Sequence, residues 1–314
     1  MKWKLAVAAS ALVSVCLQAS AADAPSCRNV RFADVGWSDI AATTGMASVV
    51  LEGMGYTPSV TFASIPVALS GLKNKQIDVF LGYWNPTMTQ LVEPFVQAGQ
   101  IKVLEQPNLV GAKYSLAVPQ YLYDKGLKSF DDIARFQKEL QGKIYGIEPG
   151  NDGNALIQGM IRDNKFGLQN FQLVESSEAG MLMQAQAALR NRKAIVFLGW
   201  EPHPMNMQMK MRYLAGGDEV FGPNLGEARV YTAMPPGYEA RCPNVATFLK
   251  NLQFSTDMEN QVMGPILEKV KPNVAARGFL KRNPVLVEPW LRGVTTFDGQ
   301  EAAPEVRAFL KRPS

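Results

Sequence analysis

Short apolar runs alternate with amphipathic segments along most of the chain. Runs bounded by glycine or polar residues are typical of buried strands, whereas apolar positions three or four residues apart predict helices that bury one face. Strands are predicted over Asn29–Val35, Val60–Ser64, Asp78–Leu81, Ala112–Pro119, Lys143–Ile147, Phe171–Val174, Ala194–Leu198 and Glu227–Pro235. Helices are predicted over Ile40–Met54 and Pro66–Lys75, after Ser129, Asn154 and Glu178, and in three or more segments between Val245 and Leu291. This alternation predicts an α/β fold with parallel sheets.

Two of the predicted strands, Ala112–Pro119 and Glu227–Pro235, have no helix that pairs them with the preceding unit. We interpret each of them as a crossing between two α/β lobes. Lobe 1 is then formed by residues 22–115 and 215–314, and lobe 2 by the inserted residues 116–214. Two lobes joined by two crossover segments predict a periplasmic solute-binding protein fold, in which the ligand lies in a cleft that closes by a hinge.

The sequence Val-Phe-Leu-Gly occurs once in each predicted lobe, and a tryptophan follows it both times. Trp84 comes two residues after Gly82, and Trp200 directly follows Gly199. We expect the glycine to end the strand and to let the backbone turn sharply. Each tryptophan would then lie at the carboxyl end of a strand, where open α/β sheets bind their ligands. The alternative is that both tryptophans fill the core.

Two further aromatic residues are placed to join these tryptophans. Trp37 follows a predicted strand and Gly36, and Tyr114 lies on the first crossing between the lobes. Electron-rich ring faces attract a cation, and a quaternary ammonium group has no N–H to donate, so an aromatic cage is how such a cation is recognised. At about 1–2 kcal/mol per ring, four rings would supply roughly 4–8 kcal/mol, which approaches micromolar affinity.

Two polar residues accompany the rings. Asp39 lies two residues after Trp37, at the start of a predicted helix, and Asn151 lies in a glycine-bracketed turn before another helix. Each has a local alternative. Asp39 would be an ordinary helix cap, for which Ser38 is an equally good candidate, and Asn151 would serve the turn.

The amino terminus has the parts of an export signal. Lys2 and Lys4 precede the apolar stretch Leu5–Leu17, and Ala19–Ala21 offers a cleavage site, so that residues 1–21 would be removed. We therefore expect the mature protein in the periplasm. The formal net charge is +4, two charges of which belong to these lysines, and the remaining +2 argues neither for a nucleic-acid partner nor for an anionic membrane surface, so we expect no nucleic acid.

Removal of the signal would also remove Cys16 and leave Cys27 and Cys242. Two cysteines in an oxidising compartment most simply form one disulfide. The alternative is two unrelated buried thiols.

The sequence contains none of the catalytic motifs that would indicate an enzyme. The single histidine, His203, stands between two prolines, and the chain has no G-x-S-x-G, no glycine-rich phosphate loop and no C-x-x-C pair. We expect neither catalysis nor a cofactor.

A copper(I) carrier is a distant alternative, because thioethers and an imidazole are ligands that copper(I) prefers. The residues concerned are His203, Met205, Met207, Met209 and Met211. Methionine at alternate positions is also typical of a half-buried strand, and Lys210 and Arg212 would occupy its solvated face. We favour this second interpretation and expect no metal site.

Six segments carry a resemblance that extends over essentially the whole mature chain. They are "DVGWSDI", "VFLGYWNPTM", "GAKYSLAVP", "YGIEPGNDGN", "LVESSEAG" and "VFLGWEPHPMN". Together they resemble the periplasmic choline-binding proteins of ABC importers, within the wider glycine betaine/proline betaine substrate-binding family.

The resemblance implies a set of roles. The aromatic box around the trimethylammonium group would be formed by Trp37, Trp84, Tyr114 and Trp200, Asp39 and Asn151 would hold the hydroxyl of the ligand, and Cys27 would pair with Cys242. The protein would be a monomer that delivers choline to an ABC permease in the inner membrane. Because Tyr83 and Asn85 flank the second tryptophan, carnitine and glycine betaine stay alternatives to choline.

Overall fold

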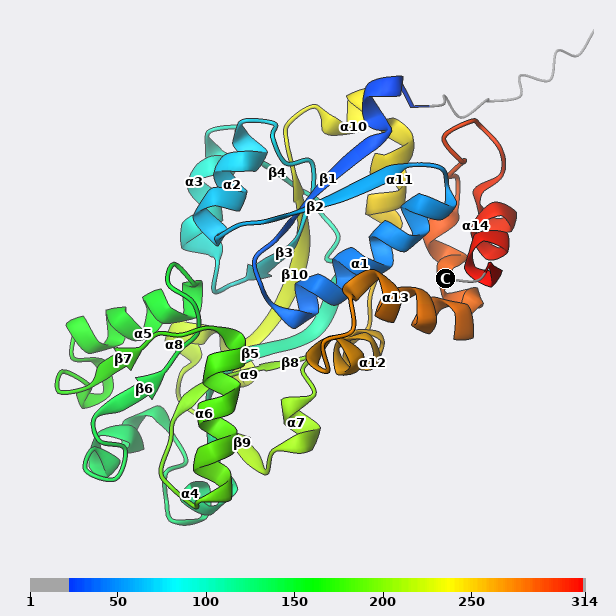
Figure 1. Ribbon diagram of the computed structural model, residues 1–314. Helices are drawn as coiled ribbons and strands as arrows, with labels where there is room; N and C mark the ends of the chain where they lie inside the picture. The colour runs from blue at the N-terminus through cyan, green and yellow to red at the C-terminus, as the bar shows by residue number, and fades with distance from the viewer. Residues whose placement is uncertain (1–22, 313–314) are drawn as a thin grey trace, which may run out of the picture.

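The computed structural model describes residues 23–312 and has the expected two-lobed α/β architecture (Figure 1). The predicted signal peptide therefore lies outside the described residues. The upper lobe in Figure 1 contains β1 (Asn29–Asp34), α1 (Ser38–Gly53), β2 (Thr57–Phe62), α2 (Ile65–Lys73), β3 (Phe80–Asn85), α3 (Thr89–Gln97), β4 (Lys102–Val103), α10 (Tyr238–Arg241), α11 (Pro243–Asn251), α12 (Thr256–Leu267), α13 (Pro272–Arg282) and α14 (Ala302–Lys311). It corresponds to lobe 1.

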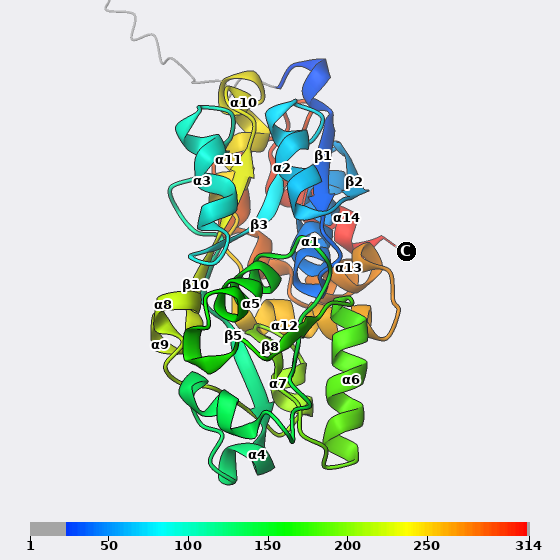
Figure 2. The same cartoon turned by 90° about the vertical axis from the view of Figure 1, so that its left-hand side faces the viewer.

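The lower lobe contains the elements expected in lobe 2, and the boundaries at residues 115 and 214 stay a prediction. It contains α4 (Gln120–Asp124), β6 (Lys143–Tyr145), α5 (Asp152–Arg162), β7 (Gln172–Val174), α6 (Glu178–Arg190), β8 (Phe197–Glu201), α7 (Met205–Gln208) and β9 (Met211–Tyr213). Figure 2 shows the same division from the side, with α10 near the upper end and α4 at the lower end. Within residues 23–312, no helix has the length and apolar character needed to cross a membrane.

One continuous mixed sheet runs through both lobes. Its order is β3-β10-β5-β8-β6-β7, with β5 at Leu109–Pro119 and β10 at Glu227–Met234, while β1 and β2 form a separate parallel pair. β10 is antiparallel to β3 and β5, and β5 is antiparallel to β8. The prediction of parallel sheets therefore holds for β1 with β2 and for β6 with β7 and β8, but it is wrong for the strands that cross between the lobes. The crossing strands lack the helical connection that a parallel neighbour requires.

The two Val-Phe-Leu-Gly segments differ from the prediction in one respect. β3 continues through Gly82 to Asn85, and β8 continues through Gly199 to Glu201, so neither glycine ends its strand. The neighbouring strands maintain the pairing, because Trp84 lies opposite Val230 and Trp200 lies opposite Tyr114. Both tryptophans nevertheless lie near the carboxyl ends of their strands. A cis peptide bond follows each strand, at Asn85–Pro86 and at Glu201–Pro202.

The methionine-rich segment is not the single strand that its alternation predicted. It forms the short helix α7, followed by β9. Met205 and Met209, four residues apart, are buried, whereas Met207 is 75% exposed. The alternating methionines therefore also satisfied a helical spacing, and two of them fill the core as expected.

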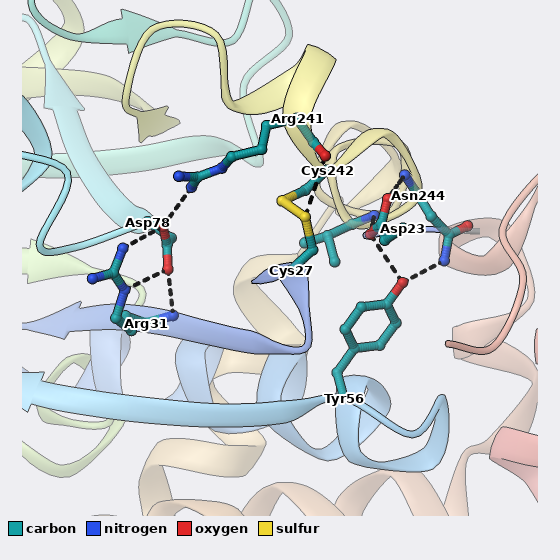
Figure 3. Close-up of a disulfide and its surroundings, with 9 residues drawn as sticks. Asp23, Cys27, Arg31, Tyr56, Asp78, Arg241, Cys242 and Asn244 are labelled. Carbon is teal, nitrogen blue, oxygen red and sulfur yellow. Dashed lines mark hydrogen bonds and ion pairs between the residues drawn. A yellow bond between two sulfur atoms is a disulfide. The ribbon is translucent and has the colours of Figure 1, made fainter. Parts of the chain in front are cut away.

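The start of the described chain is tied to the start of α11 in lobe 1. Cys27 and Cys242 form a disulfide, as predicted, and both residues are buried (Figure 3). Asp78 nearby accepts hydrogen bonds from Arg31 and Arg241, which links β1 to α10. The two chain segments that form lobe 1 are thus cross-linked on either side of the inserted lobe 2.

Candidate functional site

A pocket lies between the lobes and brings all six predicted ligand-binding residues together. It is lined by Trp37, Asp39, Trp84, Tyr114, Ile147, Asn151, Asp152 and Trp200. Each of these side chains is at most 6% exposed. Lobe 1 contributes the start of α1 and the end of β3, whereas lobe 2 contributes the start of α5 and the end of β8. Contact of these residues with a ligand stays a prediction.

Tyr114 lies at the centre of the aromatic group. Its ring centroid is 6.0 Å from that of Trp84 and 6.2 Å from that of Trp200, and both contacts are edge-to-face. The Trp200 contact follows from the register, because Tyr114 on β5 lies opposite Trp200 on β8. The face of an aromatic ring is the part that attracts a cation.

Trp37 joins the group from a turn. Gly36 before it has φ +93°, a conformation that side chains disfavour, and this turn carries the chain from β1 into α1. The indole N–H of Trp37 donates a hydrogen bond of 2.8 Å to Glu148 Oε1 of lobe 2. The ring is therefore oriented by a contact that crosses the cleft.

Asn151 has the local role that the sequence offered as its alternative, and it also lies in the pocket lining. Its Oδ1 atom accepts a hydrogen bond from Asn154 N at 3.2 Å and so caps α5, and it also accepts the hydroxyl of Tyr114 at 2.9 Å. Its amide nitrogen Nδ2 has no partner among the described residues. Gly153 makes this arrangement possible, since a Cβ atom there would meet the Tyr114 hydroxyl at 2.2 Å.

Asp39 does not cap α1. It is the second residue of the helix, and no side chain forms a cap bond there. Its Oδ1 atom has no hydrogen-bond partner of ordinary geometry among the described residues, and neither has the indole N–H of Trp84, but the Trp84 side chain lies near enough to lower the pKa of Asp39 in part. Burial and the nearby charge of Glu178 raise the pKa of Asp39 to about 7, because both disfavour its ionised form. A buried carboxylate with an unused oxygen can accept a hydrogen bond and complement a cation.

Two lining residues were missed by the sequence analysis. Ile147 follows β6, and Asp152 directly follows Asn151 at the start of α5. Asp152 is a second buried carboxylate whose Oδ2 atom has no partner among the described residues, and burial raises its pKa to about 6. An acidic residue in the first turn of a helix has an ordinary electrostatic explanation, which hid its position in the pocket.

Tyr83 and Asn85 do not line the pocket. They alternate with Trp84 along β3 and therefore point to the other face of the sheet. The side-chain amide of Asn85 donates to the hydroxyl groups of Tyr83 and Thr89. The residues that kept carnitine and glycine betaine open in the sequence thus have no contact with this site.

His203 is buried and engaged on both ring nitrogens. Met205 N donates to its Nδ1 atom at 3.0 Å, and its Nε2 atom lies 3.3 Å from Glu178 Oε1. Within residues 23–312, no group of three or more His, Cys, Asp and Glu side chains is placed to hold a metal ion. The methionines beside His203 are divided between the core and the surface, since Met205 and Met209 are buried and Met207 is exposed, and no observation supports the copper alternative.

Comparison with known proteins assigns most of the chain to a family. A family model described as the substrate-binding domain of an ABC-type glycine betaine transport system matches residues 28–282. Among curated relatives, the glycine betaine/carnitine transport binding protein GbuC of Listeria monocytogenes is 28% identical over 175 residues. That match covers 56% of this chain and 57% of GbuC, which is less than two thirds of its length.

Two solved structures are similar to this chain over most of its length. An ABC-transporter choline-binding protein in complex with choline is 51% identical and has a TM-score of 0.90, with 92% of this chain and 100% of that chain covered. A choline-binding protein in an unliganded, semi-closed conformation is also 51% identical, with a TM-score of 0.83 and coverage of 91% and 100%. The present structure therefore superposes better on the liganded arrangement of the lobes.

Proposed function

This chain belongs to the family of substrate-binding domains of ABC-type glycine betaine transport systems, and from that membership we propose that it captures a trimethylammonium compound, choline in the first place. The ligand would occupy the pocket between the lobes. A choline-binding protein of 51% identity, solved with choline, supports this choice of ligand.

The observation that carries the proposal is the chemistry of the pocket lining. Four aromatic rings and two carboxylates surround the cavity, and none of the described residues that line it is Lys, Arg or His. Choline is a quaternary cation with one hydroxyl group. The rings would attract its cation, while Asp39 and the free amide of Asn151 would bond its hydroxyl.

The same lining disfavours ligands with a carboxylate of their own. The carboxylate of glycine betaine would lie near Asp39 and Asp152 without a positive side chain to pair with. Like charges at close range raise the free energy of the complex. Carnitine, which has both a hydroxyl and a carboxylate, should bind with intermediate affinity. The name of GbuC makes glycine betaine and carnitine the necessary competitors in the test.

In transport, the mature protein would act in the periplasm as a monomer and deliver its ligand to an ABC permease in the inner membrane. Of the predicted lobe boundaries, at residues 115 and 214, we keep the first as part of this proposal. One observation favours a return crossing later than residue 214, because Phe221 of α8 (Asp218–Phe221) packs against Phe130 of lobe 2. A hinge at β10 would then move α8 together with lobe 2.

Calorimetric titration of the mature protein with choline, carnitine and glycine betaine tests the proposal directly. We expect choline to bind most tightly. Trp84→Ala and Trp200→Ala should each cost at least about 2 kcal/mol, more than tenfold in affinity. Trp84→Phe, which keeps a ring face, is the matched control and should lose less. If both alanine variants bind choline within about twofold of the parent, the ligand lies elsewhere.

A further inference from the structure

A carboxylate of lobe 2 reaches across the cleft to the first turn of α1. Glu178, the first residue of α6, accepts a hydrogen bond of 2.9 Å from the backbone N–H of Ser38. The end of α6 that faces lobe 1 is visible in Figure 2. Glu178 is 5% exposed, and it is not among the described residues that line the pocket. The bond, called here the cross-cleft contact, therefore joins the lobes beside the site without using the ligand.

The cross-cleft contact provides a partner for a backbone N–H group at the start of α1. The first N–H groups of a helix have no partner within the helix, and the helix dipole favours a negative charge there. α1 has 16 residues, and its own residues provide no side-chain cap. Glu178 thus supplies from the other lobe a hydrogen-bond acceptor of the kind that a capping residue would normally supply. When the cleft opens, this N–H group loses its partner.

His203 holds Glu178 in the required orientation. Because Met205 N donates to Nδ1 of His203, the proton of the neutral ring lies on Nε2, which faces Glu178 Oε1 at 3.3 Å. The ring of His203 also lies 5.0 Å from that of Trp200, between their centroids. The carboxylate is therefore connected to a tryptophan of the proposed cage.

A second bond between the lobes lies one residue away. Glu148 of lobe 2 accepts the indole N–H of Trp37, the residue that directly precedes Ser38. Two consecutive residues of lobe 1 are thus held by two carboxylates of lobe 2. Asp39 follows directly, so the contacts act on the segment that carries one ring and one carboxylate of the pocket.

We propose that Glu178, oriented by His203, is a positioning residue that stabilises the closed cleft through the N–H of Ser38 and thereby slows release of the ligand. This inference rests on the proposed function, because it assumes that the pocket binds a trimethylammonium ligand. A buried hydrogen bond with an ionised acceptor must break before the lobes separate. The contact therefore acts on the dissociation rate more than on the association rate.

The substitution Ser38→Pro tests the cross-cleft contact, because it removes the one backbone N–H group that donates to Glu178. Ser38 is the first residue of α1, where proline is tolerated, and Trp37 before it has ψ 146°, which suits a following proline. Ser38→Pro removes the donor and also the hydroxyl, which bonds Met263 Sδ. Ser38→Ala removes the hydroxyl alone and is the matched reference.

Stopped-flow tryptophan fluorescence and calorimetry with choline would then compare these variants. We expect Ser38→Pro to bind at least about fivefold more weakly than Ser38→Ala, with most of the change in the dissociation rate. Glu178→Ala should show a similar loss. Glu139→Gln, an exposed glutamate of lobe 2, should match the parent.

The double variant Glu178→Ala/Ser38→Pro provides the sharpest check. Because both changes remove the same bond, it should bind about as well as the weaker single variant. Fully additive losses, or equal dissociation rates for Ser38→Pro and Ser38→Ala, would overturn the cross-cleft contact. Choline binding by the parent tests the proposed function separately, and the comparison of the variants applies to whichever of the three ligands the parent binds.

Discussion

At the scale of single residues, Asp39 has the most unusual environment in the site. Its carboxylate is buried, one oxygen has no partner among residues 23–312, and its pKa is raised to about 7. Glu178 and Glu259 both lie near enough to interact with its charge, and burial together with Asp39 raises the pKa of Glu259 well above its ordinary value. An ionised Asp39 in the empty pocket is therefore costly, and a bound cation would offset that cost.

Replacement of Asp39 by asparagine should separate the candidate ligands. For choline, Asp39→Asn removes a charge-assisted hydrogen bond and the charge that complements the cation, a loss of roughly 1.5–3 kcal/mol. For glycine betaine, the same change removes repulsion, so its affinity should stay the same or rise slightly, and carnitine should lie between. Calorimetry measures all three affinities. Equal losses for choline and glycine betaine would contradict the choline assignment.

The raised pKa of Asp39 also predicts how binding depends on pH. Choline favours the ionised carboxylate, whereas the empty pocket favours the protonated form below a pH of about 7. Affinity should therefore be highest above pH 7 and fall by up to about tenfold per pH unit below it, with release of a proton on binding. Calorimetry in buffers of different ionisation enthalpy counts that proton. Asp39→Asn should reduce proton release, and any remainder would come from Asp152, whose pKa is raised to about 6.

At the scale of elements, α11 is capped by a residue far from it in sequence. The helix begins after Cys242 without a side-chain cap of its own. Asp23 accepts the N–H groups of Asn244 at 2.8 Å and Val245 at 3.0 Å, and it also accepts the hydroxyl of Tyr56 (Figure 3). One carboxylate thus satisfies two of the free N–H groups at the start of the helix.

Asp23→Ala should therefore lower the free energy of unfolding by about 2 kcal/mol, from the loss of the cap and of a bond to a buried hydroxyl. Choline affinity should not change, because Asp23 lies outside the pocket lining. Denaturant unfolding and calorimetry measure the two quantities. Asp131→Ala, at an exposed aspartate in the first turn of the 3₁₀ helix Phe130–Phe136, is the control. Equal stability of the two variants would refute the cap.

At the scale of the whole molecule, the chain combines one continuous sheet with two lobes that close on a shared pocket. The sheet passes between the lobes through β5 and β10, and β5 carries Tyr114 to the place where both lobes meet. The disulfide joins the two segments of lobe 1 and forms no link between lobe 1 and lobe 2. Membership of a transport family confirms the prediction that the chain is not an enzyme.

Much of this organisation could be predicted from the sequence because it depends on local patterns. The strand–helix alternation, the two crossings and the tryptophans after the repeated Val-Phe-Leu-Gly are short-range features. They indicated Trp84, Trp200 and Tyr114 as candidates, whereas the full set of six residues around the pocket also depended on the resemblance to a known family. The disulfide was predictable for a different reason. Removal of the predicted signal leaves only Cys27 and Cys242, and two cysteines in an oxidising compartment most simply pair with each other.

Only the tertiary structure decided the remaining features, because each depends on residues that are far apart in sequence. Strand direction in the sheet follows from which strands become neighbours, and no local pattern records that β10 lies between β3 and β5. The position of Asp152 in the pocket requires the first turn of α5 to face lobe 1. The bond from Ser38 to Glu178 spans 140 residues, and its donor is a backbone N–H that every residue except proline possesses. The sequence determines which chemical groups the chain carries, whereas the tertiary structure determines which of these groups come into contact.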